Sequence, residues 1–181
     1  MSDLQAGFLS LLETHDYLDE LFGLHQQAVL LMNWDLAEEL LSAYRKLLEL
    51  HISHEEGNLL PLFERAGQIP RAPSILFTGQ HKKLLGQLQV LASRLAHARE
   101  DGIEPRRHAI ALLDLETTFK HLSEHHDGAE MESFYPTIQR IASEQEHQTI
   151  LVRCRSEWCR ARDSLVDLVA RAHRVLEASA S

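Results

Sequence analysis

The amino-acid sequence predicts an all-α protein, and three observations support this fold class. The chain of 181 residues contains 32 Leu against 6 Val and 8 Ile, and Leu favours helices whereas β-branched residues favour strands. Apolar residues recur at intervals of three and four, for example at Leu84, Leu88 and Leu91. No segment combines sustained apolar–polar alternation with hairpin signals. We therefore expect helices throughout the chain.

Helix boundary signals divide the chain into five predicted helices. The first begins near Ser2 or Ser10, since each is followed three residues later by Gln or Glu, the capping-box pattern. It ends around Met32, and Asn33 caps the second helix. The second helix ends near Gly67, because glycine commonly follows the last residue of a helix.

The last three helices follow from the same kinds of signal. Ser74 begins the third helix, which stops at Asp101–Gly102. Pro105 suits the first turn of the fourth, where the missing N–H has no intrahelical partner to lose. Ser143 opens another capping box and begins the fifth helix, which is expected to continue to about Ala178.

The predicted architecture is an up-down-up-down four-helix bundle with an additional C-terminal helix. Short connections between long helices place neighbouring helices antiparallel. We expect the bundle over residues 1–143 and the additional helix over residues 144–181. The additional helix carries its own apolar stripe, so we expect it to pack on the bundle or on a partner subunit. A homodimer through this helix is one expected assembly.

Composition excludes several classes of protein. Lys and Arg number 18 against 27 Asp and Glu, and this net charge of −9 argues against nucleic acid as the main partner. No apolar run approaches the ~18 residues of a membrane span. The two cysteines cannot form a disulfide framework, which predicts a cytoplasmic protein. The 12 histidines are the surplus that requires a chemical explanation.

Two segments, His51–Pro61 and His126–Pro136, repeat one pattern. In both, Glu follows His by four residues and Pro follows that Glu by six. Residues four apart on a helix lie on one face, with Cβ atoms about 6 Å apart. An ionised Glu in a helical core is costly unless it is paired or coordinates a metal. Two such His–Glu pairs facing inward would supply two nitrogens and two carboxylates that can bridge metals.

The first and third helices can each add a histidine to these two pairs. His81 lies in an otherwise apolar stretch of the third helix. The first helix offers His15 or His25, which are ten residues apart and therefore face different sides of the helix. The spacing alone leaves these two alternatives open.

This pattern resembles the signature of the hemerythrin-like (HHE cation-binding) family. That signature is one His on the first helix, H-x-x-x-E on the second, one His on the third and H-x-x-x-E on the fourth. The corresponding residues are His15, His51, Glu55, His81, His126 and Glu130. The family places its first ligand early in the first helix, which favours His15 over His25. The resemblance covers roughly residues 8–143 and leaves the fifth helix outside.

The resemblance implies a centre of two Fe ions bridged by both carboxylates and by an oxo or hydroxo group. Mixed nitrogen and oxygen ligands suit Fe, and Mn or Zn would also be accepted. A position on each ion would remain for O2, NO or peroxide. The oxygen-carrying hemerythrins have a second His one turn earlier on the third helix, where this chain has Phe77, and H-x-x-x-x-D on the fourth. These departures argue against simple reversible oxygen carriage.

Three functions are therefore expected in order of preference. The first is a non-haem di-iron protein that binds O2, NO or peroxide for sensing, storage or detoxification, rather than a dedicated enzyme. The second is iron handling or the repair of damaged iron centres. The third is a metal-free helical bundle that binds another protein. The remaining histidines are expected at the surface or beside the ligands, with His97, His108, His147 and His173 at the surface.

Overall fold

The computed structural model describes residues 7–69, 72–99 and 104–179, and within these ranges the regular structure is entirely helical. The all-α prediction is therefore confirmed. The elements are η2 (Gly7–Leu12), α1 (Glu13–Leu30), α2 (Trp34–His54), η3 (Glu55–Leu59), α3 (Leu60–Arg65), α4 (Ser74–Ala96), η4 (His97–Arg99), α5 (Pro105–Ala129), η5 (Glu130–Phe134), α6 (Tyr135–Ile141), α7 (Glu144–Asp163) and α8 (Val166–Ser179).

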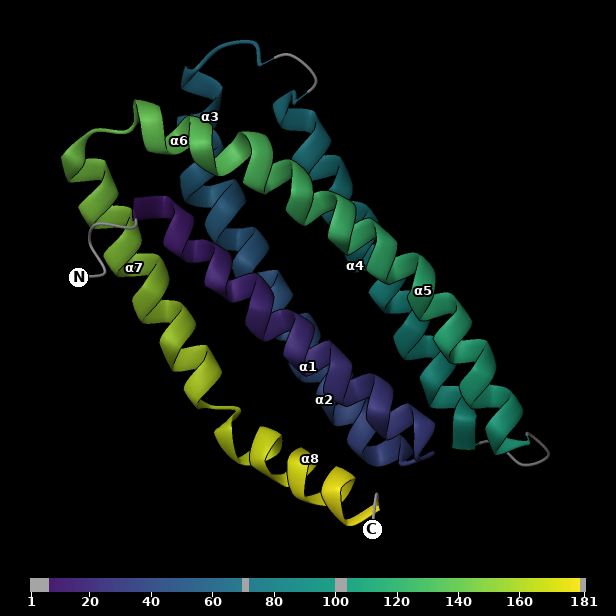
Figure 1. The fold of residues 1–181 in the computed structure, drawn as a ribbon. Helices are drawn as coiled ribbons and strands as arrows, with labels where there is room; N and C mark the ends of the chain where they lie inside the picture. Colours follow the sequence, from purple (N-terminus) through teal and green to yellow (C-terminus); the bar gives the residue numbers. More distant parts are fainter. Residues whose placement is uncertain (1–6, 70–71, 100–103, 180–181) are drawn as a thin grey trace.

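Four long helices surround the main core. Helix α1 packs on α2, α2 on α4, α4 on α5, and α5 on α1. Figure 1 shows α1 beside α2 and α4 beside α5, with the two pairs side by side. Their inward faces bury a leucine-rich cluster that includes Leu21, Leu40, Leu88 and Leu112. Burial of these apolar faces, at about 25 cal/mol per Å², holds the four helices together.

Several predicted helix boundaries are confirmed. The Asn33 side chain accepts a hydrogen bond from the Leu36 N–H at 3.2 Å and so caps α2. Pro105 is the first residue of α5. Ser143 forms the predicted capping box with Glu146 at the start of α7. The connections between helices were therefore readable from local sequence chemistry.

The predicted start of the first helix was wrong at Ser10. This residue lies inside the 3-10 helix η2, and its hydroxyl donates to the Gly7 carbonyl rather than capping α1. Helix α1 begins at Glu13 without a side-chain cap. The alternative start at Ser2 and the predicted stop at Asp101–Gly102 lie outside the described residues.

The predicted fifth helix is two helices rather than one. The chain turns at Ser164 and Leu165, between the end of α7 and the start of α8. This turn allows α7 to pack on α2 and η2 while α8 packs on α1 (Figure 1). The packing of each half on a different element is what overrides the continuous helical pattern of the sequence.

The second and fourth predicted helices each contain a π-helical turn, η3 and η5. Each π turn begins at the Glu of a His–Glu motif. It is followed directly by a short α-helix, α3 or α6, whose second residue is Pro61 or Pro136. Proline has no N–H and its ring crowds the carbonyl four residues earlier, so the regular α-helical ladder cannot continue through it. The N–H of the residue before each proline instead bonds five residues back, to the carbonyl of Glu55 or Glu130. Such π turns are frequent at functional sites.

No helix in residues 7–69, 72–99 and 104–179 is sufficiently long and apolar to cross a lipid bilayer.

Candidate metal centre

The structure brings the six residues predicted as ligands together between α1, α2, α4 and α5. They are His15 on α1, His51 on α2, Glu55 at the start of η3, His81 on α4, His126 on α5 and Glu130 at the start of η5. Five of them are at most 4% exposed, and the side chain of His15 is 11% exposed. Ligand atoms from these residues form two groups, and within each group all of them lie within 4.8 Å of one another.

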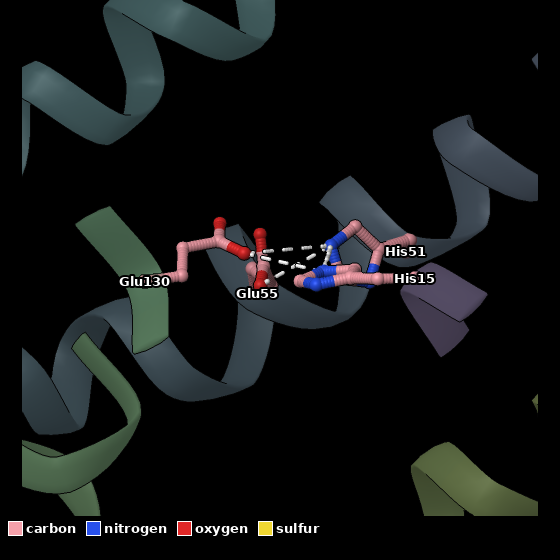
Figure 2. Close-up of side chains that lie close together, drawn as sticks. All are labelled: His15, His51, Glu55 and Glu130. Carbon is pink, nitrogen blue, oxygen red and sulfur yellow. Dashed lines mark hydrogen bonds and ion pairs between the residues drawn. The ribbon is translucent and has the colours of Figure 1, made fainter. Parts of the chain in front are cut away.

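The first group contains His15 and His51 with both carboxylates. The two Nε2 atoms are 3.1 Å apart. His15 Nε2 lies 3.2 Å from Glu130 Oε2, and His51 Nε2 lies 3.3 Å from Glu55 Oε1. Figure 2 shows the two imidazole rings and the two carboxylates converging on one small volume. This group offers two nitrogens and two oxygens to a cation.

The second group contains His81 and His126 with the same two carboxylates. His81 Nε2 lies 3.1 Å from Glu55 Oε2, and His126 Nε2 lies 2.8 Å from Glu130 Oε1. The two imidazole rings meet edge to face, with centroids 4.8 Å apart. The second group therefore offers the same donor set as the first.

Each carboxylate is divided between the two groups. Glu55 turns Oε1 toward His51 and Oε2 toward His81. Glu130 turns Oε2 toward His15 and Oε1 toward His126. Each carboxylate could therefore offer one oxygen to a cation in either group.

Two of the four histidines are oriented by neutral hydrogen-bond acceptors. His51 Nδ1 lies 3.3 Å from the Thr14 hydroxyl, which itself donates to the Leu11 carbonyl and therefore accepts from the ring. His126 Nδ1 lies 3.2 Å from the side-chain oxygen of Gln80. These contacts place the proton of each ring on Nδ1 and turn the Nε2 lone pair toward the carboxylates.

The other two histidines face carboxylates from behind. His81 Nδ1 bonds Glu56 Oε1 at 2.8 Å. His15 Nδ1 lies 3.9 Å from Asp127 Oδ1, which is beyond hydrogen-bond distance. A carboxylate that accepts a hydrogen bond from one nitrogen of a metal-bound imidazole fixes the ring. It also makes the other nitrogen, which binds the metal, a stronger electron donor. All four imidazoles therefore present Nε2 to the interior of the cluster.

Several buried polar atoms of this cluster have no hydrogen-bond partner. They are Glu55 Oε2, His81 Nε2, His126 Nε2 and both carboxylate oxygens of Glu130. Buried polar atoms are normally satisfied, and a buried carboxylate without a partner costs several kcal/mol unless a cation binds it. The unsatisfied nitrogens and oxygens lie within the two groups of ligand atoms, and each group could hold a metal ion.

The close packing of these groups displaces their pKa values in opposite directions. Burial and the neighbouring Glu130 raise the pKa of Glu55 to about 7. Burial acts to lower the pKa of His15, but the negative charge of Glu130, whose Oε2 lies 3.2 Å from His15 Nε2, outweighs this and raises the pKa to about 9. Burial and the charge of His15 hold the pKa of His51 well below its usual value. The buried carboxylates and imidazoles therefore strongly perturb one another's pKa values.

His25, the alternative ligand from the first helix, lies in a separate buried contact. Its Nδ1 lies 2.8 Å from the Ala37 carbonyl, and its Nε2 lies 3.0 Å from Glu116 Oε1. The second oxygen of Glu116 accepts from the Gln26 amide at 3.1 Å. His25 is fully hydrogen-bonded and is not part of the six-residue cluster.

Sequence reasoning missed four residues that hydrogen-bond side chains of the cluster: Thr14, Glu56, Gln80 and Tyr135. Glu56 and Gln80 each adjoin a predicted ligand in the chain, which was an available but weak signal. Tyr135, whose hydroxyl donates to Glu55 Oε1 at 2.7 Å, immediately precedes Pro136. Its role depends on the π turn, which the sequence did not reveal.

The expectation of a surface position for His108 was wrong. This side chain is 5% exposed, and its Nε2 lies 3.0 Å from the Arg94 carbonyl near the end of α4. Its ring also meets Trp34 edge to face, with centroids 5.7 Å apart. His108 therefore joins the start of α5 to the end of α4, a contact between segments that local sequence patterns do not report.

No protein-family model, curated protein or solved structure matches this chain. The functional assignment must therefore come from the side chains themselves.

Proposed function

We propose that this chain is a non-haem dinuclear metal protein of the hemerythrin-like type. It holds two Fe ions and binds O2, NO or peroxide for sensing, storage or detoxification. Its four long helices form the up-down-up-down bundle of that family. What supports the bundle is the closed order of contacts from α1 to α2, α4, α5 and back to α1.

One observation carries this proposal: both buried carboxylates divide their oxygens between two histidine pairs. A network of hydrogen bonds alone would leave its donors and acceptors matched. Here Glu55 Oε2 and both Glu130 oxygens lack a donor, although they lie among four imidazoles. Two cations, one at each group, would satisfy these atoms and balance the buried negative charge.

Each residue has a defined task in this proposal. His15 and His51 would hold one ion, His81 and His126 the other, and both carboxylates would bind the two together. Bound Fe would supply the ability to exchange electrons with O2 or a related small ligand, which the side chains alone lack.

The protein also limits access of water to the cluster. Three rings, those of Phe63, Phe77 and Phe134, pack on one another with centroids 4.8 to 5.5 Å apart, and in the sequence Phe77 and Phe134 are each four residues from a ligand, His81 or Glu130. Each ring is at most 2% exposed. Phe77 stands one turn before His81, where a further histidine would add a ligand to the second group. The chain therefore supplies equal numbers of imidazoles to both ions.

Metal analysis of anaerobically purified protein tests the proposal. Two Fe per chain and a visible absorption band that depends on O2 would support it. Iron that passes readily to an apo acceptor protein would favour iron handling or repair instead. Absence of bound metal after reconstitution would leave the metal-free interaction protein as the remaining function.

A further inference from the structure

Tyr135 is tied to both glutamates of the cluster. Its backbone N–H donates to the Glu130 carbonyl, the hydrogen bond that closes the π turn η5. Its side-chain hydroxyl donates to Glu55 Oε1 at 2.7 Å. The residue is 1% exposed, so neither bond competes with solvent. One residue therefore links the carboxylate-bearing turns of α2 and α5.

The hydroxyl of Tyr135 makes the two carboxylates unequal. Among their four oxygens, Glu55 Oε1 accepts this hydrogen bond, whereas Glu55 Oε2 and both oxygens of Glu130 have no donor. Oε1 is also the oxygen that faces His51 at 3.3 Å. The phenol thus acts on the side of Glu55 that belongs to the group of His15 and His51.

We propose that Tyr135 is a positioning residue for the dinuclear centre. It holds Glu55 Oε1 toward His51, and it thereby sets the affinity of the group formed by His15 and His51. This inference rests on the proposed function. Residues that hydrogen-bond a metal ligand commonly contribute about 10- to 100-fold to metal affinity.

The effect is expected to be confined to one of the two ions. The group of His81 and His126 contacts Glu55 through Oε2, which does not bond the phenol. Glu130 contributes to both groups and does not depend on the Tyr135 hydroxyl. Loss of that hydroxyl therefore weakens binding at the first group and leaves the second nearly unchanged.

The test compares Tyr135→Phe with Tyr44→Phe in the full-length chain. Tyr44 is a matched control because it is also a buried tyrosine, 2% exposed, but it packs on Phe22 and Phe119. Phenylalanine at 135 keeps the ring in place against Phe134, so the fold should be retained, which circular dichroism checks. Metal-free protein is titrated anaerobically with Co(II), and uptake and visible d–d absorption are recorded.

Wild type and Tyr44→Phe should each bind two Co(II) ions with the same affinities and spectra. Tyr135→Phe should bind one ion normally and the other about tenfold more weakly, with altered d–d bands for the weaker ion. If Tyr135→Phe binds two ions with wild-type affinity and spectrum, the proposed role of Tyr135 is overturned and the proposed function is not. Equal losses in both variants would also overturn it. Failure of wild type to bind Co(II) would instead overturn the proposed function together with this inference.

Discussion

Two sets of buried histidine and glutamate side chains lie between α1 and α5, and they differ in how completely they are hydrogen-bonded. His15 and His126 belong to the six-residue cluster, whereas His25 and Glu116 form a separate pair ten residues further along α1 and ten residues earlier on α5. Ten helical residues correspond to about 15 Å. Each set therefore takes a residue from α1 and a residue from α5.

The pair of His25 and Glu116 is saturated with hydrogen bonds. Both ring nitrogens and both carboxylate oxygens have partners, supplied by the Ala37 carbonyl and the Gln26 amide. The six-residue cluster instead leaves both oxygens of Glu130 without a donor. Burial of His and Glu is therefore not in itself a sign of a metal site. Unsatisfied lone pairs that converge on one point are the distinguishing feature.

The largest effect is expected from Glu130→Ala, because this carboxylate contributes to both groups. The variant should lose most of its bound metal, as measured by elemental analysis of the reconstituted protein. The variants Glu116→Ala and His97→Ala should keep their bound metal. Equal metal content in Glu130→Ala and wild type would remove the basis for distinguishing the two sets.

Glu116→Ala should show the opposite behaviour, with normal metal content and reduced stability. The change removes the partner of His25 Nε2 and of the Gln26 amide, and the side chains of His25 and Glu116 are both 0% exposed. Leaving such groups unpaired costs on the order of 3 kcal/mol of unfolding free energy. Denaturant unfolding of the metal-free protein measures this cost. A change of only a few tenths of a kcal/mol would mean that this pair has no structural role.

Metal binding should stabilise the wild type. A ligand that binds the folded state alone adds about 2.7 kcal/mol when present at 100 times its Kd. Thermal unfolding with added metal and with a chelator should show this difference in wild type and in Glu116→Ala. In Glu130→Ala the difference should be small. A shift of similar size in Glu130→Ala would place the metal elsewhere.

A smaller effect is expected from pH. Burial acts to lower the pKa values of His15 and His81. Their carboxylate partners outweigh burial and raise the two pKa values to about 9 and about 10. Because the pKa values are raised in the folded state, the protonated rings stabilise the metal-free protein below about pH 6.5. This contribution is lost as the pH rises through 9 and 10. Metal must displace the same protons, so affinity should increase with pH over this range.

Calorimetric titration in buffers of different ionisation enthalpy measures the protons released on metal binding. Release of protons near pH 7 is expected for wild type. Metal uptake with no proton release would show that the bound ion does not compete with the protons on His15 and His81.

Short-range signals predicted most of the helices and the two His–Glu motifs, and the family resemblance completed the set of six with His15 and His81. The four-residue interval in each His–Glu motif places both side chains on one helical face, and Asn33 and Ser143 cap helices through contacts three residues away. Spacing alone left His15 and His25 as alternatives, and only the family resemblance favoured His15. The partner of His25 is Glu116, 91 residues distant, and no local pattern indicates that contact.

The other missed features also depend on tertiary packing. The sequence predicted helix through Pro61 to near Gly67, but it did not reveal the π turns that precede Pro61 and Pro136. The break between α7 and α8 arises because the two halves pack on different helices. His108 is buried by contacts with α4 and Trp34 that only the folded chain brings together.

The central claim is that both carboxylates are shared by two metal ions within one chain. Electron paramagnetic resonance of the Fe-reconstituted, oxidised protein, combined with an iron count, tests it most directly. Two Fe per chain bridged by Glu55 and Glu130 should couple magnetically and leave little signal from isolated high-spin Fe(III). One Fe per chain, or two Fe that give the full signal of uncoupled ions, would contradict the shared arrangement.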